Sequence, residues 1–237
     1  MKVPISWLKE FVNLEGISIE ELSHTLTMAG LEVEEIVYLG LPMPSGQQPA
    51  KLSGLAWDRN KIVVGEIREV LPHPNADRLV LCRLYDGKQE HTVLTGAPNL
   101  FENSGKGPLK QPLKVAYAKE GAEIYDGHQP GFEKTVLKRA KIRGVESYSM
   151  VCSEKELGIS EEHEGIILLG NDAEAGMPLA DYMGDAVFSI AITPNIARAA
   201  NIYGVAREVA ALTGRKLRAM PAAVKAEGPT VIGKAKI

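Results

Sequence analysis

The stretch that decides the fold is Ile62-Val63-Val64-Gly65-Glu66-Ile67-Arg68-Glu69-Val70. Its dense β-branched residues are typical of a strand. Four similar runs follow, with Asp86-Gly87 and Asp126-Gly127 as turn signals between them. These runs are residues 79–85, 91–95, 114–118 and 134–142. Five short strands predict a small barrel or sandwich, from which the polar segment 99–112 departs as a long loop.

The residues that precede these strands predict two helices and one strand. A short helix is expected over 6–12, and Ser18-Ile19-Glu20-Glu21 is a capping box that begins a second helix. Gly30 is suited to the left-handed end of that helix, and residues 31–39 are rich enough in Val, Ile and Tyr to be extended. Residues 40–57 contain prolines, glycines and serines without a period, which predicts a linker.

The residues that follow the strand-rich module predict a strand and then a helix. Residues 188–192 read as the strand, and Thr193-Pro194-Asn195 as a turn in which Asn195 caps the helix. An apolar stripe runs from Ile202 to Leu212, and Gly214 ends it. Because each α-containing end is too small to bury a core alone, we expect the ends to pack together around an inserted β module. The expected class is α+β, a β-barrel inserted into a small split α/β host domain. The expected boundaries are 1–58 for the first half of the host with the linker, 59–170 for the barrel, 171–216 for the second half, and 217–237 for the start of a following domain.

The composition is that of a globular protein. Of 237 residues, 45% are hydrophobic and 24% charged, so the chain can bury enough apolar surface to fold. No apolar run is long enough for a membrane helix, and Lys9-Glu10 interrupts the position where a signal peptide needs its apolar core. Cys82 and Cys152 have no metal-ligand spacing, and two reduced, buried thiols predict a cytoplasmic location. No metal site and no catalytic motif are expected.

The charges are unevenly distributed. The net charge is −3 overall, but it is −5 over residues 1–58, zero over 59–170 and +2 over 171–237. Within the neutral module, one ten-residue segment carries five cations and no acid, and this is the sole local indication of an anionic partner. Its cations are Lys134, Lys138, Arg139, Lys141 and Arg143. The alternative is a solvated strand and turn with no such role.

Several motifs, taken together and in order, resemble the N-terminal part of the bacterial phenylalanyl-tRNA synthetase beta subunit. They are VPISWLKE (3–10), LTMAGLEVE (26–34), HPNADRL (73–79), GAPN (96–99), KIRGVES (141–147), CSEKELG (152–158), TPN (193–195) and GVARE (204–208). The resemblance implies that residues 59–170 are an OB-fold tRNA-binding domain and that the ends form its host domain. It also implies that the ligase site belongs to the alpha subunit, and that editing, anticodon-contacting and catalytic-like domains follow in the complete subunit. The chain is thus expected to be a catalytically inactive fragment without cofactors of its own.

The same resemblance implies the properties of the whole enzyme. These are aminoacylation of tRNA(Phe) with ATP and Mg²⁺ and an alpha2-beta2 assembly with the alpha subunit. The sequence departs from the family pattern at Asn195-Ile196-Ala197-Arg198, where the family has Asn-Arg-Pro-Asp, and at Ser149, where it has glycine. The first departure puts in doubt any role that the family assigns to the Arg and Asp of its motif, and a serine in place of glycine is expected to change the local backbone.

The basic segment is the candidate for phosphate contact. Successive side chains of a strand point to opposite faces. If residues 134–142 form one strand, Arg139, Lys141 and Arg143 share one face, and Lys134 and Lys138 share the other. We expect one of these two sets to contact phosphate and favour Arg139, Lys141 and Arg143, with Lys138 as a further candidate for tRNA binding. The alternative is a structural Arg143 that pairs with Glu146 or Glu154.

The matching motifs supply further candidates for hydrogen bonds to RNA. The residues are Asn75, Arg78, Asn99, Ser147, Ser153 and Glu154. For the two asparagines the alternative is turn formation through their short amides. The candidates for stacking on an unpaired base are Tyr117, Tyr125, Phe132 and Tyr148, each with a core or rim role as the alternative.

Two functions therefore stay open. The first is a tRNA-binding and assembly portion of a phenylalanine–tRNA ligase. The second is a protein-interaction module without a nucleic-acid role, which the net charge of −3 favours. A free-standing tRNA chaperone is disfavoured, because segments 1–39 and 188–214 add a host that a small chaperone lacks.

Overall fold

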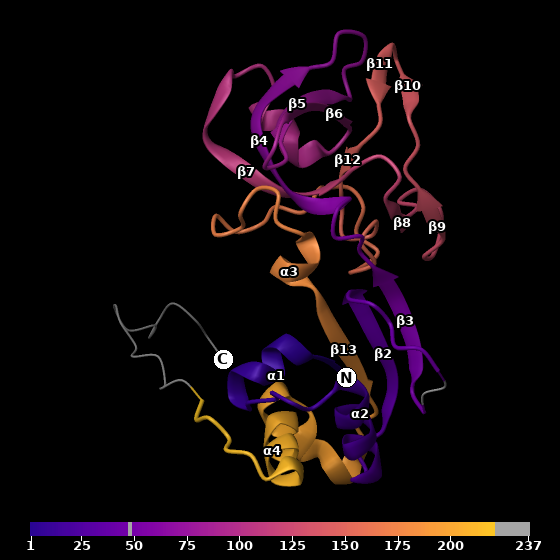
Figure 1. Cartoon of the computed structure of the whole chain (residues 1–237), viewed down its shortest axis with the longest axis vertical. Helices are drawn as coiled ribbons and strands as arrows, with labels where there is room; N and C mark the ends of the chain where they lie inside the picture. Colours follow the sequence, from indigo (N-terminus) through magenta and orange to yellow (C-terminus); the bar gives the residue numbers. More distant parts are fainter. Residues whose placement is uncertain (47–48, 221–237) are drawn as a thin grey trace, which may run out of the picture.

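The computed structural model describes residues 1–46 and 49–220, which form two bodies joined by extended segments (Figure 1). We expected residues 217–237 to begin a following domain, and of these, residues 221–237 lie outside the described part of the chain. Segments from both ends of the chain meet in the lower body, where a four-stranded sheet has the order β1-β13-β2-β3. Its strands are β1 (Lys2–Pro4), β2 (Val33–Gly40), β3 (Lys51–Ala56) and β13 (Asp185–Ile190). Its helices are α1 (Ile5–Phe11), α2 (Ile19–Met28), the 3-10 helix η2 (Pro194–Ala199) and α4 (Ile202–Thr213).

The helix ends of the lower body follow from local chemistry. Ser18 Oγ accepts a hydrogen bond from the Glu21 N–H at 3.1 Å, which confirms the predicted cap of α2. The predicted cap of α4 was wrong by six residues: Asn195 lies inside η2, and the Asn201 side chain accepts from the Gly204 N–H at 2.7 Å. Gly214 ends α4 in the left-handed conformation, at φ 66°.

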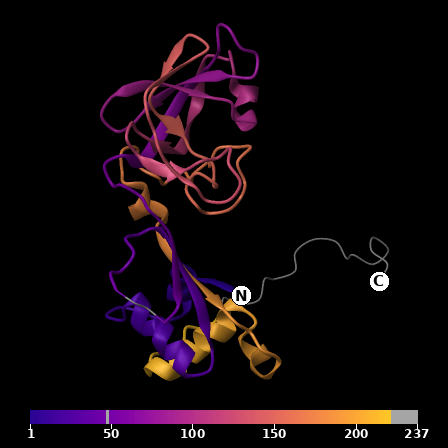
Figure 2. The same cartoon turned by 90° about the vertical axis from the view of Figure 1, so that its right-hand side faces the viewer.

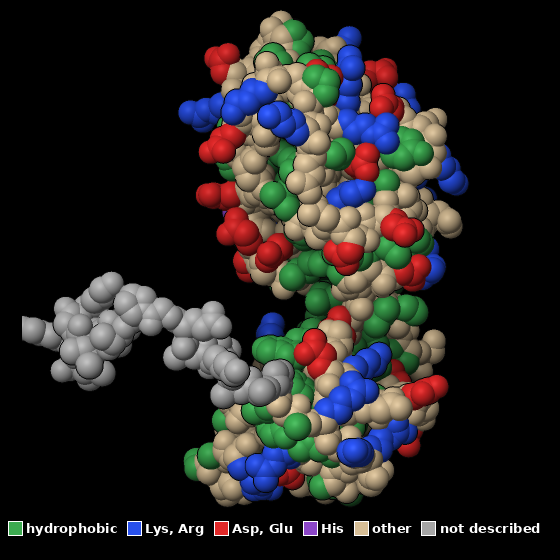
Figure 3. Space-filling view, turned by 90° about the vertical axis from the view of Figure 1, so that its left-hand side faces the viewer, with side chains coloured by type: hydrophobic (Ala, Val, Ile, Leu, Met, Phe, Trp, Pro, Cys, Tyr) green, Lys and Arg blue, Asp and Glu red, His purple; other side chains and the backbone are tan. Residues whose placement is uncertain are grey.

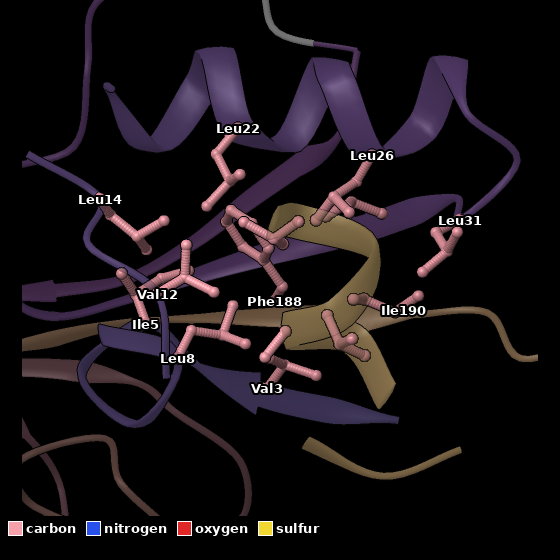
Figure 4. Packing of buried hydrophobic residues seen from close by; sticks show 14 of the residues in the cluster. Val3, Ile5, Leu8, Val12, Leu14, Leu22, Leu26, Leu31, Phe188 and Ile190 are labelled. Carbon is pink, nitrogen blue, oxygen red and sulfur yellow. The ribbon is translucent and has the colours of Figure 1, made fainter. Parts of the chain in front are cut away.

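The core of the lower body is built from both chain ends. Leu8 of α1, Leu26 of α2 and Phe188 of β13 are fully buried and converge on one face of the sheet (Figure 4). Val205 and Val209 of α4 are buried in the same cluster. Because residues near 1 and near 200 share this core, neither end could exclude water from it alone.

The linker predicted over 40–57 is wrong in its second half, since residues 51–56 form β3. This strand pairs in parallel with β2, with Ile36 opposite Leu52 and Tyr38 opposite Gly54. Gly54 has φ +122°, and a Cβ there would overlap the Tyr38 backbone carbonyl. A strand that needs glycine for a close backbone approach gives little periodic signal, which explains the error.

The upper body is a nearly closed antiparallel barrel of five strands in the order β12-β7-β4-β5-β6. The strands are β4 (Ile62–Pro72), β5 (Val80–Tyr85), β6 (Glu90–Thr95), β7 (Pro108–Ala118) and β12 (Met150–Val151). The buried side chains of Ile67, Leu84 and Tyr117 fill its interior. This architecture fits the OB-like barrel that the sequence led us to expect.

Two predictions within the barrel need correction. The segment 99–112 is not a plain loop, because it holds a 3-10 helix, η1 (Pro98–Asn103), and the start of β7. The run 134–142 is not one strand either. It divides into β9 (Lys134–Val136), which pairs with β8 (Glu123–Tyr125), and β10 (Ala140–Ile142), which pairs with β11 (Val145–Ser147).

The junction between the two bodies is apolar and narrow (Figure 3). The helix α3 (Leu179–Met183) lies there, and Leu179 shares a buried cluster with Trp57 and with Ile62 of the barrel. The Trp57 indole N–H donates to the Leu157 carbonyl at 3.2 Å, and the Arg59 guanidinium pairs with Asp181 at 2.6 Å. Figure 2 shows the connecting segments on one side of the molecule. Within the described residues, no helix has the length and apolarity needed to span a membrane.

Candidate nucleic-acid interface

The barrel has an open seam between its two end strands, β6 and β12. Among the described residues, no backbone hydrogen bond joins these strands, although they lie close together. A groove of about 430 Å³ runs along the seam. Thr95, Gly96 and Ala97 line one wall, and Ser147, Met150 and further residues of the β11–β12 segment line the other. Unpaired strand edges of this kind leave backbone N–H and C=O groups available to a ligand.

The β10–β11 hairpin stands at the upper edge of the barrel in Figure 1. Its register places Lys141 opposite Glu146 and Ile142 opposite Val145. The two turn residues, Arg143 and Gly144, have φ values of 49° and 94°, which suits the two-residue turn that hairpin twist favours. Within the described residues, Arg143 is the single non-glycine with positive φ.

Four cations near the groove are exposed and make no ion pair with any described residue. Lys138 lines the groove itself, and Lys141 and Arg143 belong to the hairpin. Arg78 lies in the β4–β5 loop, and its backbone adjoins groove residue Gly96. Of the five cations in the basic segment, Lys134 is instead paired with Glu123 at 3.0 Å.

Arg139 differs from these four cations because its guanidinium already has partners. It pairs with Glu120 at 3.1 Å and with Glu146 at 3.3 Å, and it lies 4.8 Å from the centre of the Tyr148 ring. The hydrogen bond to Glu120 raises the pKa of Arg139. The predicted alternation of Arg139, Lys141 and Arg143 on one strand face is wrong, because 139 precedes β10 and 143 lies in its turn.

The two asparagine candidates make contacts within the protein. The Asn75 side chain donates to the Arg143 carbonyl at 3.4 Å, and the Asn75 N–H donates to His73 Nδ1 at 3.0 Å. The Asn99 amide donates to the Ile166 carbonyl at 2.9 Å and accepts from the Ile166 N–H at 3.3 Å. Both side chains therefore hold loops that border the groove or the hairpin.

The serine candidates separate into an accessible and a buried one. Ser147 is half-buried and lines the groove. Ser153 is buried, and its hydroxyl donates to Glu156 at 2.8 Å, while its N–H donates to the same carboxylate at 2.6 Å. Glu154 accepts from Ser160 at 2.6 Å. Among the described residues, Arg143 forms no ion pair with Glu154 or with Glu146, which pairs with Arg139 instead.

The aromatic candidates are mostly enclosed. Tyr117 and Tyr125 are buried, which leaves no face for a base. Phe132 is exposed, but it packs against Tyr125, at 5.1 Å between ring centres, and is not among the residues that line the groove. Tyr148 has Arg139 over its ring and His91 at 6.4 Å.

A buried polar network around Asp86, at the turn between β5 and β6, has no signal in the sequence beyond the Asp86-Gly87 turn. Asp86 is 4% exposed, and its carboxylate lies 2.7 Å from Lys119 Nζ and 3.2 Å from His91 Nε2. Burial raises the pKa of Asp86, but the contacts with Lys119 and His91 and the hydrogen bonds from the Gln89 and Lys88 N–H groups outweigh it and hold this pKa well below its usual range. The network fixes the β5–β6 hairpin to β7.

Sequence reasoning also missed the groove itself. Its walls come from segments near 79, 95, 138, 150 and 165, including Thr95, Glu156 and His163. No periodicity could reveal residues that only the barrel brings together. The one available signal was the set of resembling motifs, because GAPN (96–99) and CSEKELG (152–158) both supply groove residues.

Comparisons with known proteins agree with this geometry. The family described as "Putative tRNA binding domain" matches residues 62–178. The chain is 40% identical over its whole length to the phenylalanine–tRNA ligase beta subunit of Dehalococcoides mccartyi, covering 26% of that protein. It is 41% identical over 95% of its length to the beta subunit of Geobacter metallireducens, covering 24% of that protein. The chain thus spans about a quarter of these relatives. A solved MetRS related protein from Pyrococcus horikoshii aligns with 49% of this chain and 86% of its own, at 18% identity and a TM-score of 0.31, which is too low to establish a shared fold.

Proposed function

We propose that this chain, which belongs to the family of phenylalanine–tRNA ligase beta subunits, is a non-catalytic part of that enzyme that binds tRNA through its barrel. One observation carries the proposal: inside the region matched by the tRNA-binding family, the unpaired Lys138 lines an open groove, and three further unpaired cations lie on segments that adjoin it. Arg78 belongs to the loop after the first barrel strand, and Lys138, Lys141 and Arg143 to the long connection before the last. Barrels of this class use these two loops for oligonucleotides.

The electrostatics of the surface support a phosphate-binding role. The net charge of −3 would repel RNA at long range, so affinity must come from local contacts. Arg78, Lys138, Lys141 and Arg143 can each approach a phosphate without first breaking an ion pair. Arg139 would have to leave two carboxylates, so we place it outside the set of phosphate contacts.

The remaining candidates for RNA contact have either a direct or a supporting role in this proposal. Ser147 can donate a hydrogen bond to RNA from the groove wall. Asn75 and Asn99 act through the loops that they hold, and Ser153 acts by fixing Glu156. The roles of Asn75, Asn99 and Ser153 concern the shape of the groove, so the loss of any of them should weaken binding without removing a phosphate contact.

The proposal extends to the domain arrangement and to the whole enzyme. We take residues 59–170 as a barrel inserted into a host domain formed by 1–58 and 171–216, which is supported by the shared core of the two chain ends. For the complete cytoplasmic enzyme we propose tRNA(Phe) as substrate, an alpha subunit as partner in an alpha2-beta2 tetramer, and ATP with Mg²⁺ at a site that this chain does not contribute.

A titration with labelled tRNA at about 50 mM and about 150 mM salt tests the proposal. We expect binding that weakens steeply with salt, because phosphate contacts release counterions. Reversal of Lys138, Lys141 and Arg143 to Glu should abolish measurable binding, with the circular dichroism spectrum unchanged.

The matched control reverses three exposed cations of the lower body, Lys9, Arg207 and Lys216, which changes the net charge equally. It should retain most of the affinity. Equal losses in both variants would mean that only net charge matters. An absence of binding at the lower salt concentration would refute tRNA contact by this chain and favour a protein-interaction module.

A further inference from the structure

Building on the proposed tRNA-binding function, we propose that Arg139 is a positioning residue: its contacts with Glu120, Glu146 and Tyr148 anchor the β10–β11 hairpin as a fixed cationic arm. The sequence alone suggested that Arg139 contacts phosphate. The structure places its guanidinium between the β7–β8 turn, which carries Glu120, and the segment 146–148, which carries Glu146 and Tyr148.

The hairpin needs such an anchor because it has no core of its own. None of its residues from 140 to 147 is buried, and Ile142 is 41% exposed. It is a ladder of three residue pairs that belongs to no larger sheet. An isolated two-stranded ribbon is marginally stable in water, so contacts at its ends decide whether it keeps one orientation.

The contacts of Arg139 are at the base of the hairpin. Glu120 lies in the turn between β7 and β8, whereas Glu146 lies on β11, so the guanidinium connects the barrel wall to the hairpin. Its third partner, the Tyr148 ring, is followed inward by His91 and then by the fully buried Tyr117, at centre distances of 6.4 and 5.5 Å. The arm is thereby tied to the barrel core.

A second contact holds the tip. The Asn75 amide donates to the Arg143 carbonyl at 3.4 Å, which links the hairpin turn to the β4–β5 loop that carries Arg78. With base and tip both held, Lys138, Lys141, Arg143 and Arg78 keep a fixed spacing beside the groove. RNA then binds without first ordering the arm, and such preorganisation increases affinity.

The decisive variant is Glu120→Gln with Glu146→Gln. It makes the barrel more positive by two charges and frees Arg139. If Arg139 served best as a phosphate contact, tRNA would bind more tightly, with a steeper dependence of log K on log salt. If Arg139 anchors the arm, tRNA should bind about three- to tenfold more weakly, the size expected when exposed ion pairs hold a segment. The salt slope should then stay that of the unaltered protein, because the bound state keeps its phosphate contacts.

Two further variants complete the test. Glu102→Gln with Glu133→Gln removes two exposed carboxylates that have no described ion pair, and it should tighten binding slightly. Arg139→Lys should retain more affinity than Arg139→Gln, because an ammonium can still pair with one carboxylate. Hydrogen exchange should be faster at residues 140–147 in the Glu120/Glu146 variant and unchanged in the Glu102/Glu133 variant.

The outcomes separate the two proposals. If the unaltered protein does not bind tRNA, the proposed function fails. If it binds, and the Glu120/Glu146 variant binds equally well or more tightly, the positioning role alone is overturned. Weaker binding with an unchanged slope and faster exchange in the hairpin establishes it.

Discussion

The lower-body core and the β10–β11 hairpin are held by opposite kinds of force. In the core, Leu8, Phe188 and Val205 lose all contact with water, and their contribution grows with the apolar area that they bury. In the hairpin no residue is buried, and a few point contacts at Arg139 and Asn75 set its place. The comparison teaches that the proposed RNA-binding arm can be altered at little cost to the fold.

The largest expected effect is on the core side of this comparison. Phe188→Ala should lower the free energy of unfolding by about 3–5 kcal/mol, because it leaves a cavity where both chain ends meet. Phe132→Ala, at an exposed ring, should cost much less. Urea denaturation measures both. Similar losses would show that the exposed Phe132 ring is packed as firmly as the core.

The next effect tests whether β3 belongs to the core side. Gly54→Ala should destabilise the protein by about 1–3 kcal/mol or more, because φ +122° is strained for alanine and the new Cβ meets the Tyr38 carbonyl. Gly16→Ala is the control, since Gly16 also has positive φ but has open space around it. In thermal unfolding, Gly54→Ala should have a clearly lower Tm than Gly16→Ala. Equal losses of thermal stability would mean that β3 shifts at little cost to accept a Cβ at position 54.

A pH titration sharpens the comparison within the barrel. Because the pKa of Asp86 lies well below that of an unfolded carboxyl, about 3.9, its stabilising contribution is complete at neutral pH. It declines as the pH falls below about 4, where the unfolded state binds the proton first. Asp86→Asn should lower stability at pH 7 by about 1–3 kcal/mol and flatten the acid limb of the stability curve. Tryptophan fluorescence measures the unfolding at each pH. An acid limb that is the same in Asp86→Asn and in the unaltered protein would contradict this prediction.

The smallest expected effect lies in the hairpin. Arg143→Gly relieves a left-handed residue at φ 49°, so it should raise stability by about 0.5–1 kcal/mol. It also removes a cation, so tRNA affinity and the salt slope should both fall. Lys141→Ala, which removes a charge outside the turn, should reduce affinity without the gain in stability. Calorimetry and tRNA titration separate the two changes.

Much of the fold could be predicted because burial leaves a periodic trace. The capping box at Ser18 and the strand-rich runs after Ile62 each report a local environment. The linker prediction failed at β3 because Gly54 has no side chain to contribute to an alternating pattern. It is needed there for the close approach of its backbone to the Tyr38 carbonyl. The prediction of a single strand over 134–142 failed because most of these residues are exposed, so no alternation of apolar and polar residues marks where each strand begins and ends.

The sequence by itself determined that a strand-rich module lies between two α-containing ends, and that one short segment concentrates positive charge. Only the tertiary structure decided which of those charges are free. Glu120 and Glu146 lie at different distances along the chain from Arg139, yet both reach its guanidinium, and Lys138 was left unpaired beside the groove. Hydrophobic patterns follow from each residue's own burial, whereas an ion pair depends on which of many possible partners the fold brings near.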